Sequence, residues 1–434
     1  MMYKTVEYEA VEDFKILQYK LLKNSMKYLN KYSPYYKSLF NNLNLTSESI
    51  RSLKDIQKIP ILNKASLLKH NAKIMCCDLN RASDIVTTSG STGTEPIVHP
   101  LLYSDIQRLG YNEQTSFAIA GIKASDMVMI NAAMGSGFVA GLAYYLGVKR
   151  IGASVVRTGA KNMMLQVEVL EKFPISIIIG VPSNLIKLHE YIADRKDGVE
   201  NLTKITKMVL IGEAIRNEDF SLNHLGKRLN DCYPAASLYS TYANTETCTS
   251  FCECSAGNGG HFNPELAYIE ILDKNNCELP EGIAGRLVIT TFGSQGMPLL
   301  RYDTGDITFC IKEKCKCGRI TPRIGPILGR DQNILKIGGV SFSQIQIENI
   351  ILSEPLVNDY CLVIQKNEKE IQSLLVYFSS YTNNICAIKQ ALKQNIWEML
   401  RVTADIRYCS FDELDKIQTS TASRKNIRFI SELS

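Results

Sequence analysis

ISIIIGV, at residues 175–181, is a short and almost continuously apolar run that ends in small or turn-forming residues. MVMINA (127–132) and KMVLIG (207–212) have the same character, and helix-like sequence separates the three runs. Buried parallel strands that alternate with helices are typical of a doubly wound α/β sheet. We therefore predict this sheet for the larger part of the chain, with functional residues at the carboxyl ends of its strands.

The pattern changes from about residue 265 onward. AYIEIL (267–272) and GRLVITTF (285–292) predict a β-rich subdomain that is still attached to the large domain. Further strands are expected at DYCLVI (359–364) and SLLVYF (373–378), followed by a helix whose apolar face carries Ile385, Ile388, Leu392, Ile396 and Leu400. We predict a large N-terminal domain over residues 1–329 and a small, mobile α+β domain over 330–434, with a hinge near Arg330.

Length and composition narrow the class of protein. A chain of 434 residues exceeds the size at which one core usually stops growing, and its apolar runs are too short to span a bilayer. The charged start MMYKTVEYEAVEDF does not resemble a signal peptide, so we expect a cytoplasmic protein without membrane contact. Thirteen cysteines in a reducing compartment indicate buried thiols or metal ligands. A net charge of +5 with scattered lysines predicts no nucleic-acid partner.

The segment TTSGSTGTEP (87–96) is rich in glycine and hydroxyl side chains. Its backbone N–H groups and hydroxyls are suited to surround phosphate oxygens, and glycine allows close approach of the backbone. The segment lacks the Gly-Lys-Ser/Thr of a Walker motif, so on its own it fits a flexible connection equally well.

Four further motifs follow in order along the chain. They are STYANTET (240–247), LLRYDTGD (299–306), GRDQNILKIGGVSFSQIQIE (329–348) and TASRKNIR (421–428). Together with SPYYKSLF, MGSGFVAGLAYYLG (134–147) and CKCGR, these motifs resemble the adenylate-forming superfamily of acyl-CoA synthetases and adenylation domains. Within it, the chain is most similar to the phenylacetate-CoA ligase family, and the resemblance covers essentially the whole chain.

The resemblance implies an ATP-dependent acid–CoA ligase. Such an enzyme attacks the α-phosphate of ATP with an aryl or related small carboxylate, releases pyrophosphate, and passes the acyl group from the adenylate to the thiol of coenzyme A. It needs donors and Mg²⁺ to stabilise charge on phosphate oxygens. The implied catalytic residues are Lys425, Thr245 and Glu246, and Glu246 is also the Mg²⁺ ligand.

The resemblance also assigns binding residues. The implied ATP contacts are Ser89, Gly90, Ser91, Thr92 and Gly93 for the β- and γ-phosphates, Gly212, Glu213 and Tyr242 for adenine, and Asp306 and Arg330 for ribose or phosphate. Phe138 and Ala214 are expected to line the acid pocket. Three positions depart from the family pattern: the phosphate loop has no lysine, Gln332 replaces the hinge aspartate, and Arg424 stands before Lys425 in place of glycine.

Two separated segments carry metal-ligating residues. Cys254, His261, Cys315 and Cys317 make a Cys₃His set, which is a usual composition of closed structural zinc sites. The spacing is looser than paired C-x-x-C motifs, so reduced, partly buried thiols are the alternative interpretation, and Cys248 or Cys252 are alternative ligands. Relatives have comparable segments, which favours zinc.

Two other functions stay open at this point. One is an adenylating enzyme that passes the acyl group to a carrier-protein thiol or to an amine. The other is a non-catalytic nucleotide- or zinc-binding scaffold, although the presence of Glu246, Asp306 and Lys425 disfavours it. The sequence does not fix the acid or the oligomeric state, and a homodimer is among the states it allows.

Overall fold

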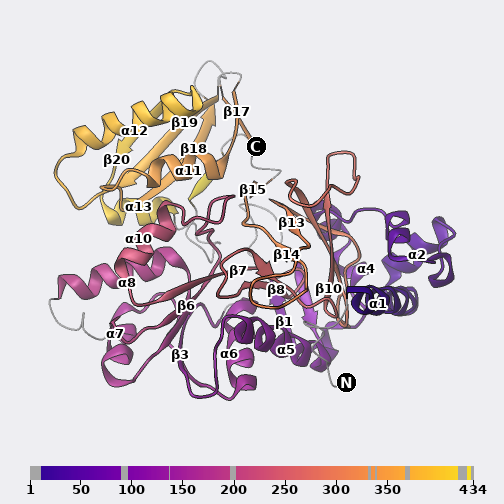
Figure 1. Ribbon diagram of the computed structural model, residues 1–434. Helices are drawn as coiled ribbons and strands as arrows, with labels where there is room; N and C mark the ends of the chain where they lie inside the picture. Colours follow the sequence, from indigo (N-terminus) through magenta and orange to yellow (C-terminus); the bar gives the residue numbers. More distant parts are fainter. Residues whose placement is uncertain are drawn as a thin grey trace. The chain divides into compact units, whose positions relative to one another are not determined.

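The computed structural model describes residues 11–88, 96–135, 137–195, 202–330, 334–337, 340–366, 372–418 and 428–431. The described residues up to Ile327 form one compact unit, and those from Leu328 onward form a second (Figure 1). Each unit is described by itself below. The phosphate-loop residues 89–93, Gln332, Arg424 and Lys425 lie outside the described residues.

The elements of the first unit are α1 (Val11–Tyr32), α2 (Pro34–Asn42), η1 (Ser47–Ser49), η2 (Leu53–Lys58), α3 (Lys64–Lys69), α4 (Asn71–Ile74), η3 (Leu79–Arg81), β1 (Asp84–Thr87), β2 (Val98–Leu101), α5 (Tyr103–Ile119), β3 (Met127–Asn131), α6 (Val139–Ile151), β4 (Ser154–Arg157), α7 (Met163–Lys172), β5 (Ile177–Gly180), α8 (Pro182–Asp194), β6 (Lys207–Ile211), α10 (His224–Cys232), β7 (Ser237–Asn244), β8 (Thr249–Glu253), β9 (Gly260–His261), β10 (Ala267–Leu272), β11 (Gly285–Thr291), β12 (Tyr302–Thr308), β13 (Cys310–Ile311) and β14 (Arg323–Ile324).

The elements of the second unit are β15 (Gly329–Arg330), β16 (Ile334–Ile337), β17 (Val340–Ser343), α11 (Gln344–Leu352), β18 (Asp359–Lys366), β19 (Gln372–Ser379), α12 (Ile385–Leu400), β20 (Ala404–Tyr408), α13 (Phe411–Gln418) and β21 (Phe429–Ser431).

A nine-stranded sheet forms the centre of the first unit, in the order β13-β14-β9-β8-β7-β6-β5-β3-β4. The strands from β4 to β7 are parallel, and β8, β9, β14 and β13 continue the sheet in antiparallel register. The three strands predicted at residues 127–132, 175–181 and 207–212 are confirmed as β3, β5 and β6, each shortened by one to three residues.

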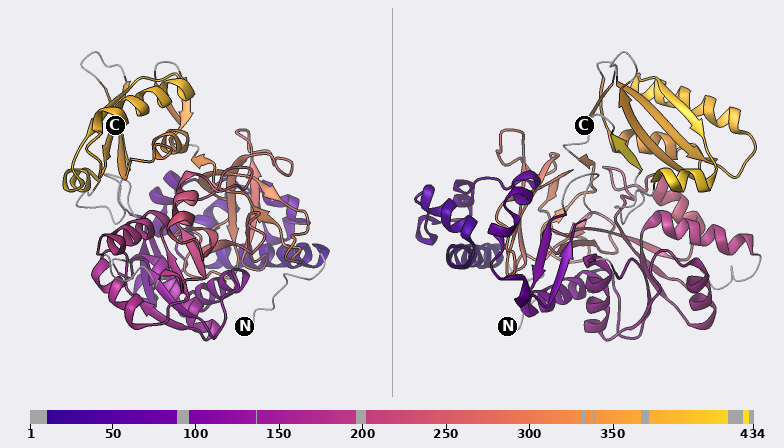
Figure 2. Two further views of the ribbon diagram at one scale, coloured as in Figure 1. Left: turned by 60° about the vertical axis from the view of Figure 1, so that its left-hand side comes forward. Right: turned by 180° about the vertical axis from the view of Figure 1, so that it is seen from behind.

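Helices cover both faces of this sheet, as the prediction of a doubly wound fold requires (Figures 1 and 2). Alternate residues of each parallel strand enter opposite cores: Ile177 and Ile179 of β5 pack with α5 and α6, whereas Ile178 packs with α7, α8 and α10. Because both faces are covered, the strands are apolar at every position, which explains their continuous runs. α6 ends at Gly152, whose φ of +88° is a left-handed conformation that glycine adopts readily.

A second sheet of the first unit carries β10, β11 and β12 as antiparallel neighbours. Its first two strands are the predicted β-rich segments at 267–272 and 285–292. The N-terminal helix α1 packs here, since Leu22, Met26 and Leu29 share a core with the segment around Leu299 and Tyr302. This packing fixes the start of β12, where the RYDTGD motif lies.

The second unit is built around a sheet in the order β20-β19-β18-β21. β18 and β19 are antiparallel, while β20 and β21 join them in parallel register. The strands predicted at 359–364 and 373–378 are confirmed, and the predicted helix is α12, with Ile388, Leu392, Ile396 and Leu400 buried in one core. The hinge near Arg330 remains a prediction.

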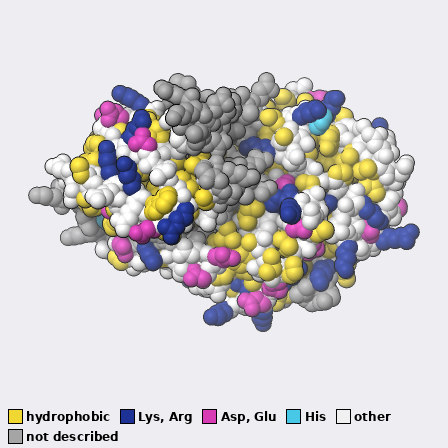
Figure 3. All heavy atoms as spheres, turned by 90° about the horizontal axis from the view of Figure 1, so that it is seen from above, with side chains coloured by type: hydrophobic (Ala, Val, Ile, Leu, Met, Phe, Trp, Pro, Cys, Tyr) yellow, Lys and Arg dark blue, Asp and Glu magenta, His cyan; other side chains and the backbone are white. Residues whose placement is uncertain are grey.

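Charged side chains of both signs are mixed on the surface that is drawn in Figure 3. On the face drawn in Figure 3, Lys and Arg side chains lie among Asp, Glu and apolar side chains. Among the helices that the structure describes, none combines the length and the apolar character needed to cross a bilayer.

Candidate functional site

The predicted nucleotide-binding residues gather around the carboxyl ends of β6 and β7 and the start of β12. Tyr242 lies in β7, and Asp306 lies in β12 of the neighbouring sheet. The Tyr242 hydroxyl donates a hydrogen bond of 2.8 Å to Oδ2 of Asp306, and Asn244 Nδ2 donates to the tyrosine oxygen at 3.1 Å. The tyrosine ring packs against Phe251 with 5.6 Å between ring centroids. Two motifs that are 64 residues apart therefore meet side by side.

Thr245 and Glu246 lie in the turn that joins β7 to β8. The turn ends at Cys248, whose φ is +47°, and the Cys248 thiol donates to the Thr245 carbonyl at 3.2 Å. The Glu246 side chain is buried and hydrogen-bonds the hydroxyl of Tyr302. Burial and the nearby carboxylates of Glu246 and Asp306 raise the pKa of Tyr302, so this tyrosine stays a hydrogen-bond donor.

A buried arginine from α5 positions that turn. The Arg108 guanidinium donates to the carbonyl of Cys248 at 2.8 Å, to the carbonyl of Leu266 at 2.8 Å and to the carbonyl of Phe292 at 2.6 Å. It also donates to the Thr249 hydroxyl at 3.1 Å. These bonds satisfy backbone acceptors at the junction of three chain segments, which holds the Thr245–Glu246 turn in place.

The side chains of the RYDTGD motif have two kinds of role: some anchor strand β12, and others contact the predicted site residues. Arg301, at 3% exposure and φ +48°, makes a two-pronged ion pair with Glu270 at 3.0 and 2.9 Å. Asp303 pairs with Arg286 of β11. Tyr302 and Asp306 point instead to Glu246 and Tyr242. The two ion pairs thus anchor the strand that presents the other two side chains.

Residues 212–214 follow β6 directly. Gly212 has φ +78°, which turns the chain sharply at the end of the strand. The Glu213 carboxylate accepts bonds of 2.9 Å from both the backbone N–H and the hydroxyl of Ser183, in the first turn of α8. The Ala214 carbonyl accepts from Asn223 Nδ2 at 2.9 Å. The segment is therefore held by a helix N-terminus on one side and by the residue that caps α10 on the other.

The remaining predicted residues are placed only in part. Phe138 is half-buried at the N-cap of α6, where it packs against the core around β3 and β5, and Arg330 is exposed in β15. For the phosphate loop the structure shows its base: the Thr88 N–H donates to the Ile97 carbonyl at 3.0 Å, next to the β1–β2 pair.

The Cys₃His residues are brought together in space. The ligand atoms of Cys254, His261, Cys315 and Cys317 all lie within 4.8 Å of one another. Cys254 Sγ is 3.6 Å from Cys315 Sγ, and Cys317 Sγ is 3.6 Å from His261 Nε2. The alternative ligand Cys252 instead accepts a bond from the Thr241 hydroxyl at 3.2 Å. Cys248, the other alternative, is the residue whose carbonyl Arg108 binds.

The antiparallel end of the main sheet positions this group. Cys254 follows β8, His261 lies in β9, and the two other cysteines occupy the connection from β13 to β14. Gly318, at φ +94°, closes a tight turn in which its N–H donates to the Cys315 carbonyl at 2.9 Å. The other ring nitrogen of His261, Nδ1, lies 3.0 Å from the Thr321 hydroxyl, which leaves Nε2 directed at the sulfurs.

The neutral imidazole of His261 and the lowered thiol pKa of Cys317 suit a metal, whereas Cys254 has to lose its proton when a metal binds. Burial lowers the pKa of His261 to about 3, with help from Arg319 and Arg323, so the ring is neutral and has a lone pair to share. Burial raises the pKa of the Cys317 thiol, but N–H donors of Arg319 outweigh it, and the net pKa lies below the usual thiol value. Burial raises the pKa of Cys254 to about 12.

Four functional residues were not identified from the sequence: Arg108, Tyr302, Arg216 and Thr321. Tyr302 lies inside the RYDTGD motif, but the sequence did not show that Glu246 is its partner. The others carry no local pattern, because their roles depend on contacts with residues 37 to 184 positions away.

Comparison with known proteins shows which proteins this chain is similar to. No protein-family model matches the chain. It is 31% identical over 377 residues to the phenylacetate-coenzyme A ligase of Thermus thermophilus, covering 84% of this chain and 82% of that protein. It is 24% identical over 434 residues to the phenylacetate-coenzyme A ligase of Aromatoleum evansii, covering 96% and 95%. A crystal structure of 2-hydroxyisobutyryl-CoA ligase in complex with an acyl-AMP matches with a TM-score of 0.84 at 19% identity, over 98% of this chain and 91% of that one, which establishes the shared fold.

Proposed function

The chain belongs to the phenylacetate-coenzyme A ligase family, and from that membership we propose that it is an AMP-forming acid–coenzyme A ligase. It activates a small carboxylic acid with ATP as an acyl-adenylate, releases pyrophosphate, and forms a thioester with coenzyme A. The observation that carries the proposal is the 31% identity, combined with the contact of Tyr242 with Asp306 and of Glu246 with Tyr302 between the carboxyl end of β7 and strand β12.

We assign the nucleotide contacts as follows. Tyr242 stacks on adenine with its ring, while its hydroxyl orients Asp306. The Asp306 carboxylate accepts hydrogen bonds from the ribose hydroxyls, because one carboxylate can receive several donors. Because the Glu213 side chain is engaged with Ser183, residues 212–214 offer backbone groups to the adenine edge. The phosphate loop and Arg330 complete this set by resemblance.

The reacting phosphate is assigned to Thr245, Glu246 and Lys425. Glu246 fits a Mg²⁺ ligand, since it is a carboxylate held by Tyr302 in the turn that also presents the Thr245 hydroxyl. When bound, Mg²⁺ supplies positive charge to the phosphate oxygens. Thr245 donates to the α-phosphate, and Lys425 bridges the carboxylate of the acid and that phosphate as a point charge.

The acid is assigned to an aryl or related small carboxylic class. The support is the name of the relatives, together with Phe138 and Ala214 as lining residues. Phe138 lies at the N-cap of α6 against a buried apolar core, and Ala214 follows the end of β6, so both can offer apolar contacts to the acid.

Incubation with ATP, Mg²⁺ and one acid at a time tests the function. Phenylacetate, benzoate and 2-hydroxyisobutyrate form a suitable panel, with pyrophosphate release and mass spectrometry as readouts. We expect acyl-adenylate without coenzyme A and acyl-CoA with it. Adenylate that reacts with an amine or a carrier-protein thiol and not with coenzyme A would support the alternative acceptor. Binding of ATP without pyrophosphate release from any acid would contradict a ligase.

We further propose that the Cys₃His group holds a structural zinc ion. Tetrahedral bonds of about 2.3 Å place neighbouring sulfurs about 3.8 Å apart, and the observed spacing of 3.6 Å fits this value. Four protein ligands leave no position for substrate, so the metal stabilises the turn between β13 and β14 and takes no part in the reaction.

Elemental analysis tests the zinc proposal. We expect about one zinc per chain after mild purification, as four thiolate and imidazole ligands bind this ion tightly. Cys315→Ser and Cys317→Ser should lose the metal, whereas Cys277→Ser, at an exposed cysteine, is the matched control and should keep it. Equal metal content in all variants would place the zinc elsewhere.

We assign the enzyme to the cytoplasm. All thirteen cysteines lie within the described residues and are free thiols. Such a composition is typical of reducing compartments.

A further inference from the structure

One ion pair joins the segment proposed for adenine to the Cys₃His group. Arg216 follows Ala214 by two residues, and Glu253 directly precedes the ligand Cys254. Arg216 Nε lies 2.7 Å from Oε1 and 2.9 Å from Oε2 of Glu253. Both side chains are largely buried, at 13% and 3% exposure.

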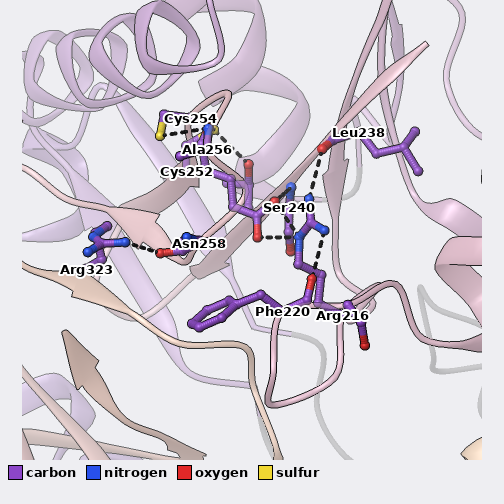
Figure 4. A network of polar contacts seen from close by, with 12 residues as sticks. Arg216, Phe220, Leu238, Ser240, Cys252, Cys254, Ala256, Asn258 and Arg323 are labelled. Carbon is purple, nitrogen blue, oxygen red and sulfur yellow. Dashed lines mark hydrogen bonds and ion pairs between the residues drawn. The ribbon is translucent and has the colours of Figure 1, made fainter. Parts of the chain in front are cut away.

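Two further chain segments, the loop at Phe220 and strand β7, fix the geometry of this pair. Arg216 Nη1 donates to the Phe220 carbonyl at 3.1 Å and Nη2 donates to the Leu238 carbonyl at 3.4 Å (Figure 4). The Glu253 carboxylate also accepts the backbone N–H of Ser240 at 3.0 Å. A planar guanidinium with this many partners has one favourable position, so a shift of Glu253 is passed on to Arg216.

The metal side of the pair is rigidly coupled to the ligands. Glu253 pairs with Gly260 in the β8–β9 ladder, directly beside the Cys252–His261 pair. The turn that starts at Cys254 passes close to the arginine, because a Cβ at Gly257 would lie 3.0 Å from Arg216 Nη2. Ordering of Cys254 and His261 by a metal therefore also orders the surroundings of the guanidinium.

The segment proposed to contact adenine is bonded to the same loop as the arginine. Arg216 forms an isolated β-bridge with Leu222, and the Asn223 N–H donates to the Ile215 carbonyl at 3.0 Å. Asn223 Nδ2 also holds the Ala214 carbonyl at 2.9 Å. The loop from Ala214 to Asn223 is thus one connected piece whose position depends on Arg216.

We propose that Arg216 is a positioning residue that couples metal occupancy of the Cys₃His group to nucleotide binding at residues 212–214. The proposal rests on the nucleotide and zinc sites proposed above. Zinc orders Cys254 and His261, which keeps Glu253 and Arg216 in place before the nucleotide arrives. The nucleotide then does not have to order the loop itself, and the two ligands bind with positive cooperativity.

Calorimetry with AMP tests this coupling, since AMP binding needs no acid and no Mg²⁺. For the wild-type protein we expect the Kd for AMP to rise about tenfold when zinc is removed by a chelator, and saturating AMP to lower the Kd for zinc by the same factor. Arg216→Gln with zinc should bind AMP about tenfold more weakly, and removal of zinc should then change its Kd little. Arg216→Lys, which keeps the charge but loses the fork, should fall between the two.

Arg228→Gln is the matched control, because Arg228 forms a half-buried pair with Glu190 between α10 and α8 in the same unit. It should keep the full zinc dependence of AMP binding. If Arg216→Gln does not fold, Arg216→Lys and the reciprocal wild-type measurement decide the matter.

The possible failures are distinguishable. A protein that binds no zinc removes both the zinc site and the coupling, and a zinc-loaded protein that binds no AMP removes the nucleotide site and the coupling. If both ligands bind and the Kd for AMP is the same with and without zinc, the coupling alone is wrong. Retention of the full zinc dependence in Arg216→Gln would assign it to a route other than this residue.

Discussion

At the scale of single residues, the site is organised by hydrogen bonds between side chains from separate motifs. Tyr242 orients Asp306, and Tyr302 orients Glu246. Neither carboxylate is simply exposed to solvent, since Glu246 is 9% and Asp306 is 4% exposed. A buried and oriented carboxylate can accept a metal ion or a ribose without first giving up many conformations, which favours binding.

Glu246→Gln and Asp306→Asn should reduce pyrophosphate release by different routes. Loss of the Glu246 charge should lower kcat by about a hundredfold, because Mg²⁺ is misplaced while charge develops on the phosphate. Asp306→Asn keeps an acceptor for Tyr242 and should mainly raise the KM for ATP, by about tenfold. Steady-state kinetics at several Mg²⁺ concentrations separate the two effects. Wild-type kinetics in both variants would remove these residues from the site.

The buried Glu113 of α5 should make stability depend on pH. Burial raises its pKa to about 7 from the usual value of 4.5, against weaker opposing hydrogen bonds from Ser250 and Asn112. Below pH 4.5 the carboxyl is protonated in both folded and unfolded chains and costs nothing. Between pH 4.5 and 7 the unfolded chain ionises first, so the folded state loses about 3 kcal/mol, and the loss persists above pH 7.

Glu113→Gln removes this titration while it keeps the shape of the side chain. The variant should therefore be more stable than the wild type at pH 8, and the difference should vanish near pH 4.5. Thermal unfolding at both pH values measures it, and Glu171→Gln, at an exposed position of α7, is the surface control. A stability difference that is equal at the two pH values would show that Glu113 acts through packing instead of charge.

At the scale of elements, the short strands at the antiparallel end of the main sheet form few hydrogen bonds of their own. β9, β13 and β14 have two residues each. Strands of this length contribute few ladder hydrogen bonds, so their positions depend on the long connections between them. Three of the Cys₃His residues lie in those connections and His261 lies in β9, so we expect the proposed zinc to compensate for the missing backbone pairing.

Removal of zinc should accordingly lower the midpoint of thermal unfolding. A ligand at a thousandfold excess over its Kd stabilises the folded state by about 4 kcal/mol, provided that it does not bind the unfolded chain. Calorimetric unfolding before and after chelation, with zinc restored at the end, measures the change. Cys277→Ser should respond like the wild type, and Cys317→Ser should not respond. An unchanged midpoint in the stripped wild-type protein would contradict a stabilising metal.

At the scale of the whole molecule, the proposed reaction needs both units. The nucleotide residues from Gly212 to Asp306 lie in the first unit, whereas Lys425 belongs to the segment after α13. Family members carry out adenylation and thioester formation as separate half-reactions. The resemblance implies that the C-terminal domain serves each of them in a different orientation about the hinge, and we therefore propose that Lys425 is required in the first half-reaction only.

Lys425→Ala should therefore separate the half-reactions. Formation of the acyl-adenylate should fall about a hundredfold or more, because charge stabilisation at the reacting phosphate is lost. Thioester formation from preformed adenylate should stay near the wild-type rate. Lys416→Ala, at the end of α13, is the control and should leave both steps unchanged. Equal losses in both steps would make Lys425 structural, and a loss in Arg424→Ala or Lys416→Ala would move the assignment to that residue.

Local patterns specified the elements and the ligand set. β3, β5, β6, β10, β18, β19 and α12 all lie where apolar runs and periodicity predict them, since alternation and continuous burial leave a direct trace in neighbouring residues. The Cys₃His residues were named from their chemistry together with the resemblance to relatives, and Cys248 and Cys252 stayed open as alternative ligands. The order of the motifs along the chain identified the family before any contact was known.

Only the folded chain decided how these pieces act on one another. The Arg108 guanidinium binds carbonyls 140 to 184 residues away, Glu213 serves the N-terminus of α8, and Arg216 selects Glu253 among many carboxylates. Nothing in the neighbouring sequence marks these partners, because a buried polar group is satisfied by whichever donor or acceptor the packing brings within reach. The periodicity of the chain fixes which faces are buried, whereas the pairing of polar groups inside them is a property of the tertiary structure.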